Sequence, residues 1–458
     1  KKRTPLPKLQ LLILLSIQFA EPVTGLVIYP FVVQFVRDTG ITGGDEGKTG
    51  LYSGLLESAF FLAESLTVLQ FGRMSDMYGR RPVLLLGPLG LALCMLGFGL
   101  SSNFWVLFGF RCAQGAFNGN IGTAFPSSAS DISDASNIAD ILSFNTVMWS
   151  VGATLSPFLG GVLANSEAKS SDTLGQIGLL RVHPYFLPCA VAASIAFASF
   201  VFAFLGLRET LPSAVARQRK KQKLATETDP LLTVETTVPE PLDVPDTAPP
   251  LRELLSRPVC IALLNSGLLA FCEMANESLQ PLVYATPIGM GGLGLQPFDI
   301  GLIMGIYGMS NAFIQLFFGG RILRRFGPLR IFNAAFCALV LAFLAYPLLI
   351  FLAKPKLHAR PLLRLRQVAY LSPGAIVDQN PTASTLIFIV DAAPNPASMG
   401  SVNGLAQLVG TALRGIAPSF SSSFFSLSVK NNLLDGYMVY FLLAGLTLGA
   451  LRCSLLLP

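Results

Sequence analysis

The chain has 458 residues, of which 52% are hydrophobic and 13% are charged, and its net charge is +6. Ordinary soluble domains carry about 25% charged residues, so this composition excludes a soluble globular protein. The seven cysteines include no CxxC pair and there are only two histidines, which argues against a metal cluster, a disulfide framework and redox chemistry.

Long apolar runs predict twelve membrane-spanning helices, because about 20 apolar residues are needed to cross ~30 Å of hydrocarbon. The runs fall into two sets of six. The first set lies near residues 9–36, 51–71, 82–101, 104–124, 141–164 and 184–207. The second set lies near residues 257–284, 299–319, 329–353, 383–393, 400–427 and 434–456. We therefore predict an all-α membrane protein with an N-terminal half at 1–207 and a C-terminal half at 257–458.

Segment 208–256 separates the two halves. It begins with basic residues and continues rich in proline and acidic residues, without a helical period, which is typical of a flexible linker. Other basic residues gather at the N-terminus, around 73–81 and around 321–330. The positive-inside rule then puts the N-terminus and the linker on the cytoplasmic side of the membrane.

Ionisable residues inside the predicted spans of the first half are candidates for function, since such groups are costly in a membrane. Glu21 lies beside Pro22 in the first span, and Glu57 and Glu64 lie one heptad apart in the second. Arg111, in the fourth span, lies at a depth similar to that of Glu57. These two are expected to form either a fixed packing ion pair or a proton-exchanging pair. For Glu21 and Glu64, the alternative role is helix packing.

A polar turn follows the second span, in the stretch GRMSDMYGRRPVLLLG. It contains Gly72, Asp76, Gly79, Arg80 and Arg81. Glycines let two helices and their connection pack closely. The aspartate can bond to backbone N–H groups or to the nearby arginines, and the arginines hold the turn on the cytoplasmic side.

The second half repeats parts of the first. The eighth span is followed by Gly320, Arg324 and Gly327, at the spacing of the two glycines and the aspartate in the turn after the second span. The fifth and eleventh spans align on Pro157 and Pro418. Repeated six-helix halves are a transporter architecture in which the substrate site lies between the halves near the middle of the membrane.

Polar residues also mark the spans of the second half. Glu273 and Glu277 are four residues apart in the seventh span and share a face, so that repulsion between them would favour a shared proton. Glu277 would instead be solvated and inert if it lay at the outer interface. Stripes with helical spacing, which either join helices or line a wet path, occur at Asn311 and Gln315, and at Asn403, Gln407, Thr411 and Arg414.

Residues 354–384 do not fit this scheme. They carry five basic residues in a loop expected to face outward, and the tenth span after them is too short to cross a membrane unaided. The segment is either an insertion that displaces part of a helix or a fault in the derivation of the sequence.

The linker contains the stretch ETDPLL. Glu227, Leu231 and Leu232 match an acidic dileucine pattern that sorting adaptors read. This match favours a vacuolar membrane over the plasma membrane, although such short patterns also arise by chance.

Three motifs resemble those of the major facilitator superfamily. The turn with Asp76 and Arg80 resembles the family's loop between spans two and three. The resemblance implies a latch that holds the two halves together on the inside and is released during transport. The stretch FRCAQG resembles the family pattern with a membrane-embedded arginine, which is Arg111 here.

The third motif, GATLSPFLGG in the fifth span, resembles the Gly/Pro motif of antiporter branches. Gly152, Pro157, Gly160 and Gly161 fit it, and Ser156 stands where the motif usually has glycine. The first span, AEPVTGLVIYP, looks like that of fungal and plant members of the drug–proton antiporter branch, including the zinc-induced-facilitator-like group.

Together these observations predict a secondary active transporter of a small solute that works by alternating access. Proton coupling is expected, with antiport favoured over symport. The chain has no GxxxxGK[ST] loop for ATP, no cluster for enzyme catalysis and no cofactor motif. We expect a monomer in the bilayer that binds no nucleic acid. An uncoupled facilitator of the same fold and a non-transporting receptor or scaffold are the alternatives.

Overall fold

The computed structural model describes residues 7–132, 138–164, 178–211, 256–314, 317–318, 320–353, 388–389 and 399–457. These residues are helical or lie in turns, with no strand among them, which confirms the predicted all-α class. Several expectations lie outside the described residues, namely most of the linker with Glu227, Leu231 and Leu232, the side chain of Asn403, Gln315, and all of 354–384.

The first half of the chain forms helices close to the predicted spans. Their bounds are α1 (Lys8–Leu26), α2 (Val32–Asp38), η1 (Glu46–Lys48), α3 (Thr49–Tyr78), α4 (Arg80–Leu100), α5 (Phe104–Asp131), α6 (Ile138–Leu163), α8 (Gly178–Val182) and α9 (Phe186–Gly206). The first predicted span is divided between α1 and α2. Pro30, which has no N–H to donate, lies in the tight turn between them, where Tyr29 N donates to Leu26 O and Phe31 N donates to Ile28 O.

The second half continues the pattern. Its helices are α12 (Arg257–Ala285), η3 (Ile288–Met290), α13 (Pro297–Ile314), α14 (Gly320–Phe326), α15 (Pro328–Ala353), α18 (Met399–Lys430) and α19 (Met438–Ser454). Across the described part of the chain, seven helices are long and apolar enough to cross a membrane by length and composition.

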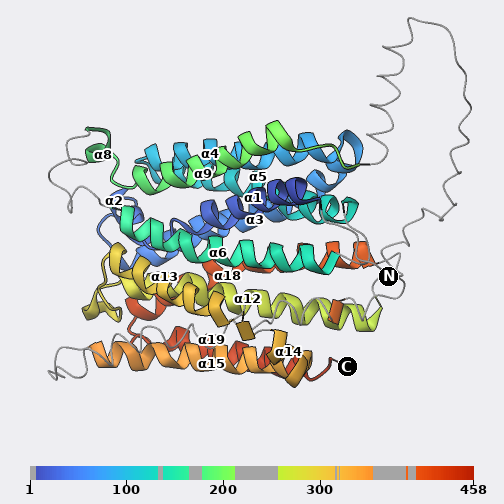
Figure 1. Cartoon of the computed structure of the whole chain (residues 1–458). Coiled ribbons are helices and arrows are strands. Elements are labelled where there is room, and N and C mark those ends of the chain that lie inside the picture. Colours follow the sequence, from blue (N-terminus) through green and yellow to red (C-terminus); the bar gives the residue numbers. More distant parts are fainter. Residues whose placement is uncertain are drawn as a thin grey trace, which may run out of the picture.

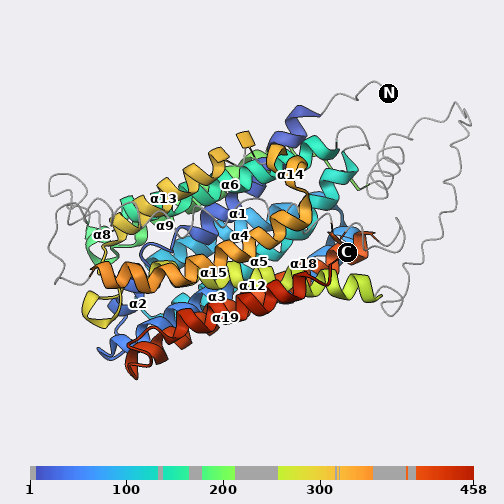
Figure 2. The ribbon, with the colours of Figure 1, turned by 90° about the horizontal axis from the view of Figure 1, so that it is seen from below.

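The helices lie side by side as one elongated bundle (Figure 1). Two pairs of helices join the halves. Helix α6 lies against α13, and α3 lies against α18; Figure 2 shows the first pair on one side of the bundle and the second pair on the other. These two seams make the most extensive contact between the halves.

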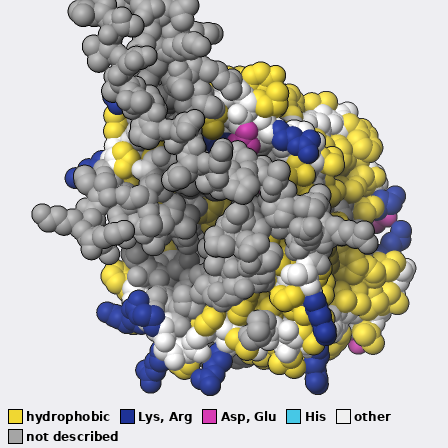
Figure 3. Space-filling view, turned by 90° about the vertical axis from the view of Figure 1, so that its right-hand side faces the viewer, with side chains coloured by type: hydrophobic (Ala, Val, Ile, Leu, Met, Phe, Trp, Pro, Cys, Tyr) yellow, Lys and Arg dark blue, Asp and Glu magenta, His cyan; other side chains and the backbone are white. Residues whose placement is uncertain are grey.

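Both chain termini lie at one end of the bundle, at the right in Figure 1, which we name the inner end after the expected orientation. The turns before α4 and α15 contain Gly79 and Gly327, whose φ angles are 113° and 80°. Residues that carry a side chain rarely adopt such backbone angles, so both turns require glycine. Lys and Arg side chains surround the described surface of this end (Figure 3).

Helices α3 and α5 approach each other closely at Gly115. A Cβ atom built on Gly115 would lie 1.9 Å from the carbonyl oxygen of Phe60, whereas one built on Gly109 would meet nothing within 4 Å. Small residues at such crossings let two backbones pack directly against each other in a membrane.

We expect Gly115→Ala to destabilise the protein by about 1–3 kcal/mol, the range for inserting a methyl group into a packed core. Gly109→Ala, on the same helix, is the matched control and should leave the melting temperature in detergent unchanged or slightly higher. Equal melting temperatures for the two variants would contradict the close α3–α5 crossing.

Candidate functional site

The halves contact each other through backbone and small side chains toward the outer end. Ser419 N donates to Ser58 Oγ at 2.9 Å, and Ser419 Oγ donates to Gly54 O at 3.3 Å. Further out, Arg37 Nη2 donates to the carbonyl oxygen of Ala285 at 3.2 Å. These bonds close the outer side of the α3–α18 seam.

The Gly/Pro motif places α6 between α1 and α13. Cβ atoms built on Gly152 and Gly160 would lie 2.6 Å from Pro22 Cγ of α1 and 2.0 Å from Val27 O just beyond it. One built on Gly161 would lie 2.6 Å from Gly301 Cα on α13. The glycines of the motif are therefore required on two opposite faces of the helix.

Two neighbouring residues complete these contacts. A Cβ atom built on Gly301 would lie 2.6 Å from Pro157 O. Ser156, the residue that departs from the family motif, is buried and donates its hydroxyl to Val23 O of α1 at 2.7 Å. The serine thus adds a hydrogen bond between α6 and α1.

Inward of these contacts, polar side chains on the spanning helices are accessible. Gln407 of α18 is exposed, and Arg414 of α18 and Glu21 of α1 are half-buried. Such groups avoid lipid and face either protein or a water-filled space.

Glu21 and Glu64 form the first charged cluster. Gln18 Nε2 donates to Glu21 Oε2 at 2.6 Å, and Asn118 Nδ2 of α5 lies 3.4 Å from Glu21 Oε1. Glu64 of α3 is 8% exposed and interacts electrostatically with Glu21. The charge of Arg414, from the opposite half, acts on both carboxyl groups. Three helices of one half and one helix of the other thus meet at this cluster.

Arg111 is the centre of a second cluster, and it is 1% exposed. Its Nη1 donates to Gln114 Oε1 and its Nη2 to Gly25 O, each at 2.9 Å, and its guanidinium lies 4.5 Å from the centre of the Phe60 ring. Glu57, 2% exposed, feels its charge. No ion pair between Arg111 and Glu57 is found among the described residues, and the two Nη groups of the guanidinium donate to an amide oxygen and a backbone carbonyl instead.

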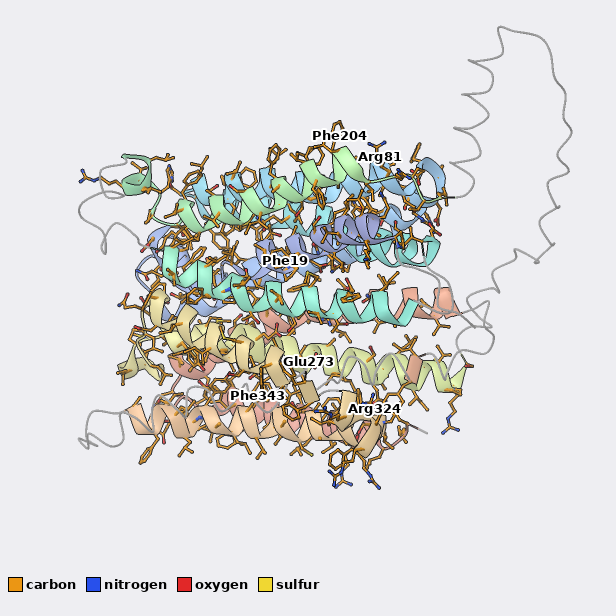
Figure 4. The ribbon with its side chains drawn as sticks, viewed as in Figure 1. Phe19, Arg81, Phe204, Glu273, Arg324 and Phe343 are labelled. Carbon is orange, nitrogen blue, oxygen red and sulfur yellow. The ribbon has the colours of Figure 1, made fainter. Side chains whose placement is uncertain are left out.

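The other candidate residues lie on α12, α13 and α18. Glu273 and Glu277 are half-buried on α12, and Glu273 lies near the middle of the bundle's length in Figure 4. Asn311 is buried on α13. Glu277 and Glu57 lie in opposite halves, on α12 and α3.

Sequence reasoning missed two partners of Glu21. Gln18 precedes it by three residues, a spacing that shares a helix face, and this signal was available. Asn118 follows Arg111 by two helical turns on α5, but its approach to α1 depends on how the helices pack. The pairing with Glu21 could not be read from spacing alone.

The inner turn between α3 and α4 is held by ion pairs of Arg80 and by the carboxylate of Glu209. Arg80 forms ion pairs with Asp76 at 2.5 Å and with Asp131 at 3.3 Å. Glu209 accepts hydrogen bonds from the backbone N–H groups of Arg80 and Arg81, at 2.8 and 3.1 Å. It thereby caps the N-terminus of α4.

Arg81 ties the same turn to α9. Its Nη2 donates to the carbonyl oxygen of Phe204 at 2.9 Å, and Figure 4 shows the two residues together at the inner end. Among the contacts that the structure describes, those of Arg80 and Arg81 stay on the side of the first half.

The amino-acid sequence of the chain matches a known family. The family model described as Major Facilitator Superfamily matches residues 14–418 of the chain. This chain belongs to the Major Facilitator Superfamily. It is therefore an integral multi-pass membrane protein of a transporter family rather than an enzyme.

Relatives in fungi and plants agree with the resemblance seen in the motifs. The chain is 30% identical over 475 residues to the major facilitator-type transporter psiT2 of Psilocybe cubensis, covering 97% of this chain and 90% of that protein. It is 26% identical over 428 residues to Zinc Induced Facilitator 1 of Arabidopsis thaliana, covering 91% and 84%. These similarities confirm the resemblance to fungal members and to the zinc-induced-facilitator-like group.

Solved structures of the superfamily confirm the twelve-helix fold. A D-xylose-proton symporter superposes with a TM-score of 0.67 at 15% sequence identity, covering 98% of this chain and 97% of that one. At this identity, the similarity concerns the fold.

Replacing Glu209 with alanine should loosen the inner turn, because α4 loses the acceptor for two backbone N–H groups, a cap worth about 1 kcal/mol. Amide hydrogen exchange of residues 79–84 should become faster, while that of the buried part of α9 stays unchanged. Unchanged exchange at Arg80 and Arg81 would contradict the capping role.

Proposed function

We propose that this protein is a proton-coupled secondary transporter that exchanges a small solute for protons by alternating access. The observation that carries the proposal is the cluster of Glu21, Glu64 and Arg414, which joins carboxylates of one half to a cation of the other. We assign it to the substrate site, which in transporters with repeated halves lies between the halves near mid-membrane.

A proton and Arg414 compete to neutralise the two carboxylates. Two carboxylates that act on each other do not both ionise readily, and they titrate as a pair. In the structure Arg414 is half-buried and makes no hydrogen bond to them among the described contacts. When the inner side closes, α18 moves toward α1 and α3. The proton leaves the carboxylates before the inner side closes. Arg414 then neutralises them in its place.

Solute binding completes the exchange. A solute with a positive or hydrogen-bonding group can take the place of the proton beside Glu21, since half-burial leaves this carboxyl accessible from the inner side. Proton and solute then cannot occupy the site together. This mutual exclusion is the minimum requirement for antiport.

The inner turn acts as the latch that the family resemblance implies. The Asp76 side chain is largely exposed while its partner Arg80 is nearly buried, so one side of the carboxylate is available to the second half. In the arrangement with a closed inner side, the turn contacts the inner end of the C-terminal half. The N-terminus, this turn and the linker with its sorting candidate lie in the cytoplasm, and the protein resides in a vacuolar or plasma membrane.

Proton coupling is tested by the variants Glu21→Gln and Glu64→Gln in proteoliposomes that contain a trapped pH dye. The solute is the strongest stabiliser found in a thermal-shift screen of the purified protein, because a ligand of the folded state raises its apparent stability. A gradient of this solute should drive proton flux in the wild type and none in either variant. Exchange of labelled for unlabelled solute, which needs no net proton movement, should persist.

Asp435→Asn is the matched control, because Asp435 is an exposed carboxylate with positive φ, which asparagine tolerates. Its proton flux should equal that of the wild type. Solute movement without proton flux in the wild type would instead identify an uncoupled facilitator. A protein that binds the solute but never dissipates its gradient would be a receptor or scaffold.

A further inference from the structure

The segment from α14 to the start of α15 carries four arginines at the inner end of the second half. They are Arg321, Arg324, Arg325 and Arg330, and all four are exposed. Figure 4 shows Arg324 at the inner end, on the side of the bundle where α14 and α15 lie. We name these four residues the basic patch.

No acidic partner accompanies the basic patch in the described part of the protein. Residues three and four apart on a helix are neighbours, so Arg321, Arg324 and Arg325 share one face of α14. Like charges at this spacing destabilise a helix. The ion pairs of the described residues include none of the four arginines. Arg321 Nη1 donates to the backbone oxygen of Phe317 at 3.3 Å instead, and the guanidinium of Arg325 lies 5.7 Å from the centre of the Phe326 ring.

The corresponding turn of the first half is neutralised by the protein itself. Arg324 occupies the position that Asp76 has in the turn after α3, four residues after one glycine and three before the next. Asp76 and Asp131 both form ion pairs with Arg80, at 2.5 and 3.3 Å. The second half has an arginine in the place of the first of these acids. The positive-inside rule accounts for basic residues at both turns, but it does not account for this difference.

Apolar surface lies directly beside the basic patch. The side chains of Phe317, Phe318 and Phe326 are exposed, and in an integral membrane protein such side chains at the end of a spanning helix meet lipid. Arginine side chains at this level keep their stems on apolar surface and extend their charged groups toward the headgroups. The basic patch therefore lies at the level of the lipid phosphates, and the adjacent aromatic side chains offer contacts to acyl chains.

We infer that the basic patch binds the phosphate groups of anionic phospholipids in the cytoplasmic leaflet. A guanidinium donates two parallel N–H···O bonds to a phosphate, and clusters of about four to eight basic residues directly cytoplasmic of a membrane span attract anionic lipid. The bound phosphates supply the negative charge that Asp76 supplies in the first half. The inference uses the proposed cytoplasmic position of the inner end and is independent of proton coupling.

The test measures lipid binding to the full chain by native mass spectrometry from detergent micelles. Phosphatidylserine and the zwitterionic phosphatidylcholine, with matching acyl chains, are titrated separately. The patch variant combines Arg324→Gln with Arg325→Gln. The matched control combines Arg73→Gln with Arg452→Gln, which removes the same charge from two exposed arginines at the inner end that lie outside the patch. Equal melting temperatures in lipid-free detergent show that both variants are folded.

The wild type should bind phosphatidylserine more tightly than phosphatidylcholine, and added salt should weaken this preference because it screens exposed charges. Each basic residue near a membrane surface strengthens the binding of anionic lipid about fivefold, so the patch variant should lose about 30-fold in affinity for phosphatidylserine. The control variant should keep the wild-type affinity. If the patch variant does not fold, Arg330→Gln alone should lose about fivefold.

Equal affinity of the wild type for the two lipids overturns the lipid site. An equal loss in the patch and control variants also overturns it, because the loss would then follow net charge. Glycerophosphoserine, the headgroup without acyl chains, should not displace the lipid. Displacement by it at similar concentrations would assign the patch to soluble phosphates instead.

The linker offers a competing anion, because residues 227–246 contain six acidic residues and no basic one. If phosphatidylserine binds only after these acids are replaced by amides, the linker covers the patch and the inference is wrong. None of these outcomes changes the expected proton flux of Glu21→Gln and Glu64→Gln, so the lipid site and the proposed function fail separately.

Discussion

The structure depends on the high free energy of an ionised side chain in a membrane interior. An isolated charge there is so unfavourable that it must meet a counter-charge, a proton, a backbone dipole or water. Arg111 meets two of these conditions by binding Gly25 O and Gln114. Glu21 meets another through Gln18 and Asn118 on the side that is accessible to water. Glu57 is 2% exposed, and its Oε2 atom has no hydrogen-bond partner among the described residues.

Small residues determine where the halves can move. At the α6–α13 seam Gly161 and Gly301 bring the two backbones together, and the residues that meet at the α3–α18 seam include Gly54, Ser58 and Ser419. Small residues let two backbones pack directly against each other at these places. One apolar cluster nevertheless contains buried residues of both halves, among them Leu56 and Leu282, so rocking of the halves must also rearrange part of this core. The charged clusters lie beside these seams, where such motion changes their surroundings.

The apolar runs and turn residues were sufficient to predict the all-α class, the helix positions and the family, because these depend on local periodicity and on motifs. The break in the first span at Pro30 was missed, since the run is apolar on both sides of it. Glu57 and Arg111 were predicted to pair, whereas the guanidinium donates to Gly25 O and Gln114 Oε1 instead. Likewise, Glu209 lies in what sequence composition assigns to a linker, and its role as the cap of α4 depends on how α9 ends beside that turn. Contacts between helices that are distant in sequence are set by packing, which residue spacing does not report.

The central claim is that opening of one side requires closure of the other. It is tested most directly by a disulfide between Ser58→Cys and Ser419→Cys, which locks the outer seam, combined with spin labels at the inner ends of the halves on Met77→Cys, whose native side chain is 62% exposed, and Arg324→Cys, also at an exposed position. The labels are attached after the disulfide has formed. The oxidised protein in lipid nanodiscs should show only the long inner distance, and reduction should restore a second, short population. A short inner distance in the cross-linked protein would contradict the account, because both sides would then be closed at once without coupling between them.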